Sequence, residues 1–229
     1  MSQSDYIFSD TQYDLELTRL QKLEQVYDPA SCDRLLTAGI TTGWQCLEIG
    51  AGAGSMMRWM SDKVGATGKV IAVDCDTRFI RDCPLNNVKI IEADILQIPL
   101  DKLFDLIHVR HVLVHLENQE LLTKIWQLLK PGGWLVIEEA DFSANRFITG
   151  TEAQQQSVEK VNEAMQRMFS NQGKDYALGI KLPSLLQQLG FENLIIGNDV
   201  AISAGNSDIA TMMKLSARQL TDKYLATDL

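Results

Sequence analysis

The chain has 229 residues, of which 45% are hydrophobic and 22% are charged, so it is long enough to bury a sizeable core without metals or disulfides. Its formal net charge of −9 and its scattered basic residues disfavour a nucleic-acid partner, because phosphate backbones are bound by clustered Lys and Arg. The cysteines form no CxxC pair, which predicts reduced thiols in a reducing compartment rather than a disulfide or zinc framework; they are Cys32, Cys46, Cys75 and Cys83.

The first fourteen residues are polar and acidic and lack the basic and apolar regions of a signal peptide. No later segment is apolar for long enough to span a bilayer. These two features predict a cytoplasmic protein with no membrane partner.

Leucines at helical spacing predict a helix over residues 10–27 that ends before Pro29, and a second short helix near 30–38 that stops at Gly39. Short apolar runs and amphipathic runs then alternate along the chain. Strands are predicted in WQCLEIG, KVIAVDCD, VKIIEADI, FDLIHVRHV and PGGWLVIEEADF, and helices in SMMRWMSDKVG, TRFIRDC and NQELLTKIWQLLK. This alternation predicts an α/β fold with a mostly parallel, doubly wound sheet.

The alternation stops after residue 142. A long polar-faced helix is predicted over 151–173, followed by a sheet-covering helix over 182–191. One or two strands are predicted in ENLIIGNDVAISA, residues 192–204, and a last helix over 210–226. Met165, Met168 and Phe169 form an apolar stripe on the long helix, which is more typical of a core than of a pocket.

Residues 47–55 read LEIGAGAGS and follow the first predicted strand. Glycines at 50, 52 and 54 let a main chain approach a ligand closely, although a tight turn with positive φ would also use them. A dinucleotide fingerprint would need a third glycine where Ser55 or Met57 stands, and the pattern of a phosphate-binding GxxxxGK loop is absent. The turn therefore indicates a ligand that approaches the backbone without offering phosphates.

Two acids follow the next two predicted strands. Asp74 can accept both hydroxyls of a ribose, and Asp94 can accept from an exocyclic amine while Ile95 covers a ring face. Either acid alone is more often a helix cap or a turn residue. Ligand-type features at the ends of three successive strands favour a binding site.

Five stretches within residues 40–140 have the order and spacing of one known family: LEIGAGAG, VIAVDCD, IEADI, FDLIHVRHVLVHL and LLKPGGWLVIEE. Through them the chain resembles the class I S-adenosylmethionine-dependent methyltransferases of the small-molecule type, with a UbiE-like domain. The resemblance implies a Rossmann-like sheet, S-adenosylmethionine as cofactor and S-adenosylhomocysteine as product. It implies that the cofactor is bound by Glu48, Gly50, Ala51, Gly52, Asp74, Cys75, Ala93, Asp94, Ile95, Val109 and Arg110. The N-terminal helix often caps the cofactor in this family, which adds Tyr13 and Arg19.

The resemblance also divides the single domain. Residues 1–40 would be cap helices, 41–141 the cofactor-binding core, 142–178 an insertion that covers the acceptor, and 179–229 a C-terminal sheet edge and helix. The family's sheet usually ends in a hairpin that adds a seventh strand. We expect this chain to lack that strand, as a truncated form of a longer enzyme would, with an exposed sheet edge that favours a homo-oligomer.

The signatures of amino-methylating [DN]PPY enzymes, cytosine C5 enzymes, protein arginine enzymes and metal-dependent catechol enzymes are missing, which leaves a small-molecule acceptor and no metal. A base helps when the acceptor is a hydroxyl or an enol. His111 and His115, expected on one helical face, are the candidate bases, and Glu138, Glu139 and Asp141 could also face the acceptor. The structural interpretation, in which each histidine bonds to the backbone, is favoured.

Arg110 has two interpretations as well. It could pair with the carboxylate of the cofactor's methionine part, or it could bridge to Asp105 or Glu138 as a structural ion pair. Two other functions also remain open. They are a non-catalytic S-adenosylmethionine-binding regulatory protein and, against the failed GxGxxG pattern, a nicotinamide-dependent oxidoreductase.

Overall fold

The computed structural model describes residues 8, 13–116 and 118–227, and its centre is one five-stranded sheet. The strand order is β3-β2-β1-β4-β5, and all four pairings are parallel. The strands are β1 (Gln45–Ile49), β2 (Lys69–Asp74), β3 (Val88–Glu92), β4 (Phe104–Arg110) and β5 (Leu129–Glu138). The order reverses between β1 and β4, where α/β sheets of this kind bind their ligands beyond the strand ends.

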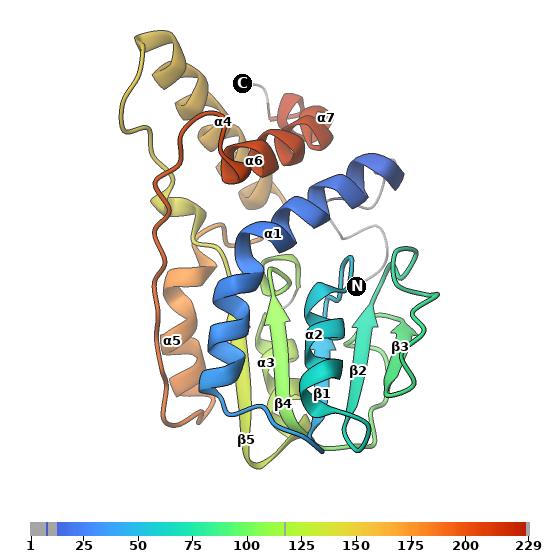
Figure 1. Ribbon diagram of the computed structural model, residues 1–229. Helices are drawn as coiled ribbons and strands as arrows, with labels where there is room; N and C mark the ends of the chain where they lie inside the picture. The colour runs from blue at the N-terminus through green and yellow to red at the C-terminus, as the bar shows by residue number, and fades with distance from the viewer. Residues whose placement is uncertain (1–7, 9–12, 117, 228–229) are drawn as a thin grey trace.

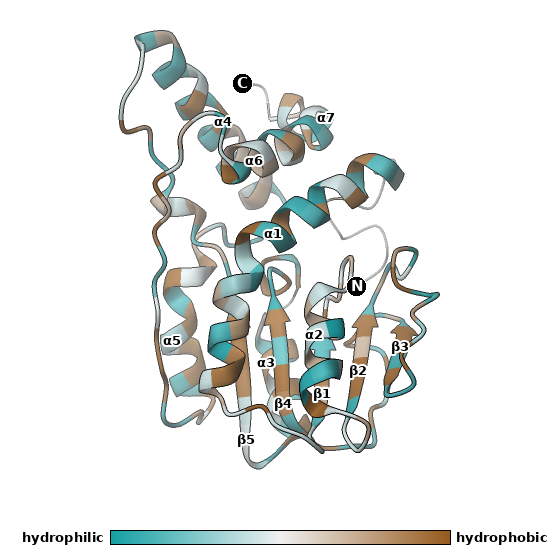
Figure 2. Ribbon diagram, viewed as in Figure 1, coloured by the Kyte–Doolittle hydropathy of each residue, from teal (hydrophilic) through white to brown (hydrophobic). Residues whose placement is uncertain are grey.

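Helices cover both faces of the sheet (Figure 1). One buried cluster joins α2 (Ser55–Val64) and the C-terminal part of α1 (Tyr13–Thr37) to one face. The other cluster joins α3 (Asn118–Leu128) and α5 (Leu178–Gln188) to the opposite face. The apolar strands between these two layers are visible in Figure 2, where β1, β2 and β4 are largely brown. A parallel sheet needs this double cover because both of its faces are apolar.

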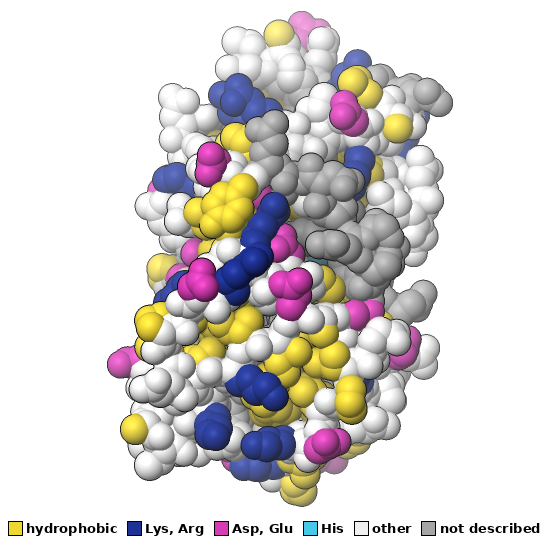
Figure 3. Space-filling view, turned by 90° about the vertical axis from the view of Figure 1, so that its right-hand side faces the viewer, with side chains coloured by type: hydrophobic (Ala, Val, Ile, Leu, Met, Phe, Trp, Pro, Cys, Tyr) yellow, Lys and Arg dark blue, Asp and Glu magenta, His cyan; other side chains and the backbone are white. Residues whose placement is uncertain are grey.

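The two edges of the sheet are β3 and β5. β3 is half-buried, in contrast to the nearly complete burial of β4. Figure 3 looks onto the β3 side and shows Lys and Arg side chains interspersed with acidic, apolar and uncharged groups. On the other side, β5 pairs only with β4 among the described strands.

Three further helices lie beyond the carboxyl ends of the strands (Figure 1). They are α4 (Glu152–Asn171), α6 (Asp208–Gln219) and α7 (Thr221–Leu225). Thr151 starts α4 with a capping box, in which its side chain and that of Gln154 bond each other's backbone amides. The predicted stripe of Met165, Met168 and Phe169 is buried in the main core cluster, so it is part of the core. Two short 3₁₀ turns, Leu113–His115 and Phe142–Ala144, follow β4 and β5.

Three sequence predictions about the elements are wrong. α1 continues through Pro29 to Thr37 as one helix, because a proline removes one hydrogen bond and bends a helix without having to end it; Figure 1 shows the change of direction. Residues 77–82 form turns instead of a helix. Residues 192–204 form no strand, so the predicted sheet edge in 179–229 is absent from the described residues.

The five described strands agree with the expectation that the seventh strand is missing from this sheet, which stays open at β5. None of the helices that the structure describes is long and apolar enough to cross a membrane.

Candidate active site

The glycine turn after β1 adopts backbone conformations that favour glycine. Gly50, Gly52 and Gly54 have φ angles of 76°, 55° and 89°. A Cβ atom on Gly50 would lie 2.2 Å from Cγ2 of Val112, so the turn after β4 packs directly on the first glycine. Gly54 is the N-cap of α2. The tight-turn interpretation therefore applies, and the space beside Gly50 is filled by the Val112 side chain; the close approach of a ligand stays a prediction.

Asp74 joins the ends of β1 and β2. One of its oxygens accepts a hydrogen bond from the Gly52 amide at 2.8 Å, and the other accepts from the Asp76 amide at 3.0 Å. Burial of the carboxyl group raises its pKa to about 6, although the two amides act in the opposite direction. A half-buried carboxylate with lone pairs still available is suited to accept the hydroxyls of a ribose, which would favour its ionised form.

The end of β3 lies against the end of β2. The Ala93 amide donates to the Asp74 carbonyl at 2.9 Å, and the Cys75 thiol lies 3.7 Å from the Ala93 carbonyl oxygen. Asp94 accepts from the Leu96 amide at 2.9 Å, and Ile95 is buried. The structure therefore brings together six of the predicted cofactor residues at adjacent strand ends: Gly50, Gly52, Asp74, Cys75, Ala93 and Asp94, with Ala51 buried in the turn itself.

α1 lies over the glycine turn. The Glu24 carboxylate accepts from the Ser55 amide at 3.0 Å, at the N-terminus of α2, and Asp28 accepts from the Ser55 hydroxyl at 3.0 Å. A Cβ atom on Gly52 would meet Cδ2 of Leu20 at 3.5 Å. Burial raises the pKa of Glu24. Sequence reasoning missed Glu24 and Asp28; their spacing of four residues on one helix face is the signal that could have indicated them.

The two predicted residues of α1 have protein partners. Tyr13 is half exposed and its ring lies 4.8 Å from the Phe79 ring. Arg19 is buried and donates two hydrogen bonds to Glu16, at 2.6 and 2.8 Å. Tyr13 of α1 therefore contacts the loop after β2, while the Arg19 guanidinium is bonded to Glu16 of its own helix.

A buried charge network crosses three strands. His108 in β4 is fully buried, with Nδ1 at 2.7 Å from Glu48 in β1 and Nε2 at 3.0 Å from Glu138 in β5. Burial by itself would lower the pKa of His108, but the two carboxylates outweigh it and raise the pKa to about 9. Arg34 of α1 donates to the other oxygen of Glu138 at 3.0 Å and also pairs with Asp199. Glu48, predicted beside the cofactor, is thus bonded to the His108 imidazolium.

Val109 and Arg110 end β4 next to this network. Val109 is fully buried. Arg110 donates to Asp28 at 2.9 Å and to the Ser31 hydroxyl at 2.8 Å, both in α1. The proposed structural partners, Asp105 and Glu138, are therefore not its partners; Asp105 instead pairs with Lys130 at 2.8 Å. Arg110 fastens α1 to the carboxyl end of the sheet.

His111 is the first residue after β4, and it is not helical. Its φ is 55°, a conformation that costs most residues other than glycine about 1–2 kcal/mol. Its amide donates to the Glu138 carbonyl at 2.8 Å. Its Nδ1 lies 3.6 Å from Glu139, and its ring packs edge-on against Tyr27 of α1 at 4.8 Å. The expectation that His111 and His115 share one helical face is wrong, since only residues 113–115 form a short 3₁₀ turn.

His115 lies in different surroundings. Burial lowers its pKa to about 3, and the charges of Lys174 and Arg19 act in the same direction. The ring is therefore neutral at any physiological pH. A cluster of three or more His, Cys, Asp or Glu side chains that could hold a metal ion is absent from the described residues.

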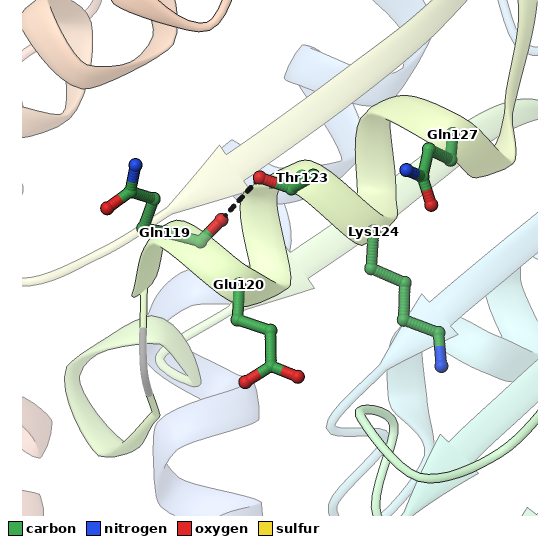
Figure 4. Close-up of a pocket in the computed structure, with 5 residues that line it drawn as sticks. All are labelled: Gln119, Glu120, Thr123, Lys124 and Gln127. Atoms are coloured by element: carbon green, nitrogen blue, oxygen red, sulfur yellow. Dashed lines mark hydrogen bonds between the residues drawn. The ribbon is translucent and has the colours of Figure 1, made fainter.

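One surface hollow lies away from these groups. It has a volume of about 690 Å³ and lies on the outer surface of α3, between polar side chains that include Gln119 and Lys124 (Figure 4). The close-up shows these side chains along one helix, and the Lys124 ammonium donates to the Leu96 and Ile98 carbonyls. The strand ends, where the polar groups converge, are the stronger candidate site.

Residues 47–137 match the family model of a methyltransferase domain. The chain is 30% identical over 122 residues to a ubiquinone/menaquinone biosynthesis C-methyltransferase UbiE from Pseudomonas savastanoi pv. phaseolicola, covering 49% of this chain and 48% of the relative. It is 36% identical over 101 residues to methyltransferase str3 from Strobilurus tenacellus, covering 42% of this chain and 35% of the relative. The chain thus spans at most about half the length of these curated relatives.

The fold has a counterpart among solved structures. A SAM dependent methyltransferase from Aquifex aeolicus superposes with a TM-score of 0.54 at 21% identity, over 76% of this chain and 87% of that one. The strand order of the sheet, the positions of the sequence motifs and the family match all indicate a methyltransferase fold. Residues 47–137 thus match a methyltransferase domain, and the chain shares the fold of the Aquifex aeolicus structure.

Proposed function

We propose that this protein transfers a methyl group from S-adenosylmethionine to a small-molecule acceptor. The proposal rests mainly on the position and bonding of Asp74. It is a half-buried carboxyl group at the end of β2, it is bonded to the glycine turn, and its oxygens can accept further hydrogen bonds. A ribose would supply the donors, since its two hydroxyls can both bond one carboxylate.

The neighbouring groups support the same cofactor. Asp94 and Ile95, at the end of β3, offer an acceptor for an exocyclic amine and an apolar surface for a ring. Gly50 and Gly52 offer backbone without side chains at the end of β1, and Tyr13 of α1 lies beside the loop after β2. When bound, S-adenosylmethionine supplies an activated methyl group with a neutral leaving group, so that in-line placement of the acceptor provides much of the rate.

The small-molecule acceptor rests on the relatives and on the enclosure of the site. The Pseudomonas relative is named a C-methyltransferase of ubiquinone and menaquinone biosynthesis. In this chain α1, α4, α6 and α7 lie beyond the carboxyl ends of the strands (Figure 1), and a cover of helices favours a compact metabolite over a polymer. Arg110, tied to Asp28 and Ser31, would position α1 rather than bind the cofactor directly.

Calorimetry with S-adenosylmethionine, S-adenosylhomocysteine and NADH tests the cofactor. We expect micromolar binding of the first two and none of NADH. Asp74→Ala should weaken binding by about 1.5–3 kcal/mol, the scale of lost charge-assisted hydrogen bonds. Unchanged affinity in that variant would refute the ribose assignment.

Catalysis needs a separate test, because a non-catalytic S-adenosylmethionine-binding protein would pass the first one. The wild type should convert S-adenosylmethionine to S-adenosylhomocysteine with some members of a panel of hydroxyl, amine and carbon acceptors. Binding without turnover across the whole panel would favour the regulatory alternative.

A further inference from the structure

The turn after β4 holds a strained residue with an unpartnered polar atom. His111 has a φ of 55°, and its Nε2 is buried without a hydrogen-bond partner among the described residues. A buried polar atom of this kind is destabilising, and strained backbone at a non-glycine residue adds to that. Cores remove such features, whereas sites for ligands and chemistry keep them.

The other ring nitrogen faces a fixed carboxylate. Glu139 has a side chain that is only 1% exposed, and Nδ1 of His111 lies 3.6 Å from it. Its oxygens accept from the Val114 amide at 3.2 Å and from the Ala140 amide at 3.1 Å. These amides hold the carboxylate beside the ring. The 3.6 Å separation is too long for a hydrogen bond, but such contacts tighten when a ligand closes the site.

The position of His111 relative to the glycine turn is fixed by its neighbour. Val112 occupies the space where a Cβ atom of Gly50 would lie. The Tyr27 ring from α1 packs against the edge of the His111 ring at 4.8 Å, which limits the ring's rotation. His111 is therefore held between the first glycine of the turn, the end of β5 and α1, at the point where the strand order reverses.

We propose that Glu139 and His111 form a carboxylate–histidine pair in which Nε2 of His111 accepts a proton, and that the acceptor of this methyltransferase is therefore a hydroxyl compound such as a phenol. The proposal rests on the proposed function. Glu139 holds the proton of the neutral ring on Nδ1, which leaves the lone pair of Nε2 free for the acceptor. His115, on the 3₁₀ turn, has its pKa lowered to about 3 by burial, which makes it a much weaker base than His111 would be.

The reaction balances with these groups alone. The acceptor oxygen forms its bond to the methyl carbon as the carbon–sulfur bond breaks, and the electron pair of that bond stays on sulfur. The hydroxyl proton passes to Nε2 of His111, and Glu139 stabilises the resulting imidazolium. The proton then leaves to solvent. A neutral amine acceptor needs no base before attack, so a built base favours a hydroxyl.

The first test measures the ring without turnover. Long-range ¹H–¹⁵N spectra of the three histidines at pH 8, assigned with His111→Gln, should show His111 with its proton on Nδ1 and an unprotonated Nε2. Glu139→Gln should redistribute the proton between the two nitrogens, whereas Glu159→Gln on the exposed face of α4 should change nothing. A proton on Nε2 in the wild type would overturn the proposal.

The second test uses S-adenosylmethionine with substituted phenols of graded acidity and with matching anilines. Wild type should methylate phenols in preference to anilines. His111→Gln should lower kcat by about 10²–10⁴-fold and Glu139→Gln by less, with calorimetric affinity for S-adenosylmethionine unchanged. The loss should shrink as the phenol becomes more acidic, because an ionised phenol needs no base. A purely structural role would give equal losses for all phenols.

His111→Gly can replace His111→Gln in the activity measurement if the glutamine variant folds poorly. Glycine accepts a φ of 55° without strain, so this variant should be at least as stable as the wild type while losing the same activity. Full activity in a folded His111→Gly, or methylation of anilines alone, would refute the base while leaving the methyltransferase intact. Absence of S-adenosylmethionine binding in the wild type would instead refute the proposed function.

Discussion

β1 and the segment of residues 194–202 are both rich in Leu and Ile, yet they lie in opposite surroundings. β1 pairs on both sides, with β2 and β4, and four of its five residues are buried. In the segment, Ile195 is 70% exposed and Ile202 is 80% exposed, and no strand forms. Asp199 of the segment pairs with Arg34 of α1, which also pairs with Glu138 at the end of β5.

The difference shows that a β-prone sequence becomes a strand only where an edge and a covering layer are available to it. β1 lies between two strands and two layers of helices. The segment lies outside α5, and Figure 1 shows it running along that helix toward α6. If this comparison is right, substitutions around β1 should have large effects and substitutions in the segment should have small ones.

The largest effect is expected at Glu48 in β1. Glu48→Ala leaves the buried His108 imidazolium with one carboxylate, and removing one partner of a buried pair costs about 3–5 kcal/mol. Urea unfolding measures the loss. Glu159→Ala, on the exposed face of α4, is the matched control and should change stability by about 0.5 kcal/mol or less. Similar losses in both variants would contradict the buried network.

The pH dependence of stability follows from His108. Its folded pKa of about 9 lies above the ordinary 6.5, so its contribution is complete below pH 6.5 and is lost as the pH rises through 9. The loss should be about 3 kcal/mol. Unfolding free energies from pH 6.5 to 9.5 should fall more steeply in wild type than in His108→Gln. Should that variant not fold, NMR titration of the wild-type ring gives the same pKa, and a value near 6.5 would refute the network.

Alanine substitutions at two glycines of one turn distinguish the destabilisation caused by a steric clash from that caused by backbone strain. Gly50→Ala places a methyl group 2.2 Å from Val112 and should cost about 2–3 kcal/mol. Gly52→Ala meets only Leu20, at 3.5 Å, and should cost about 1 kcal/mol, mainly from its positive φ. Thermal unfolding compares them. Adding Val112→Ala should restore part of the stability of Gly50→Ala and none of that of Gly52→Ala.

Cofactor affinity should depend on pH through Asp74. Its pKa of about 6 means that the carboxyl group is ionised above pH 6 and protonated below it, and only the ionised form accepts from both ribose hydroxyls. Affinity for S-adenosylhomocysteine should therefore fall up to about tenfold between pH 6 and pH 5. Asp74→Asn should bind weakly and show no such step. An equal step in both would assign the titration to another group.

The smallest effect is expected in the exposed segment. Ile195→Thr and Ile202→Thr should each change the unfolding free energy by about 0.5 kcal/mol or less, since neither side chain is buried. Ile49→Thr, the same substitution in β1 at a residue that is 1% exposed, should cost several times more. A large loss at Ile195 or Ile202 would show that the segment packs as an element in solution.

Much of the fold and half of the site could be predicted from local sequence. The four strands β1 to β4, the glycine turn and the bonds of Asp74 and Asp94 arise from residues that are close in sequence or follow successive strands. Asp74 and Asp94 each bond an amide two residues ahead, which is the reason such acids follow strands. The sequence by itself therefore predicted the strand ends at which the cofactor is proposed to bind.

The pairing of the buried charges and the position of α1 were decided by the tertiary structure. Glu48 and His108 are 60 residues apart and Arg110 and Asp28 are 82 apart, and no local pattern specifies which buried charge meets which. The same holds for α1, whose course through Pro29 carries Tyr27 and Asp28 to the strand ends, and for residues 192–204. Local propensity describes what a segment can form. Whether a charge is paired, or a strand has a neighbour, depends on which distant residues pack around it.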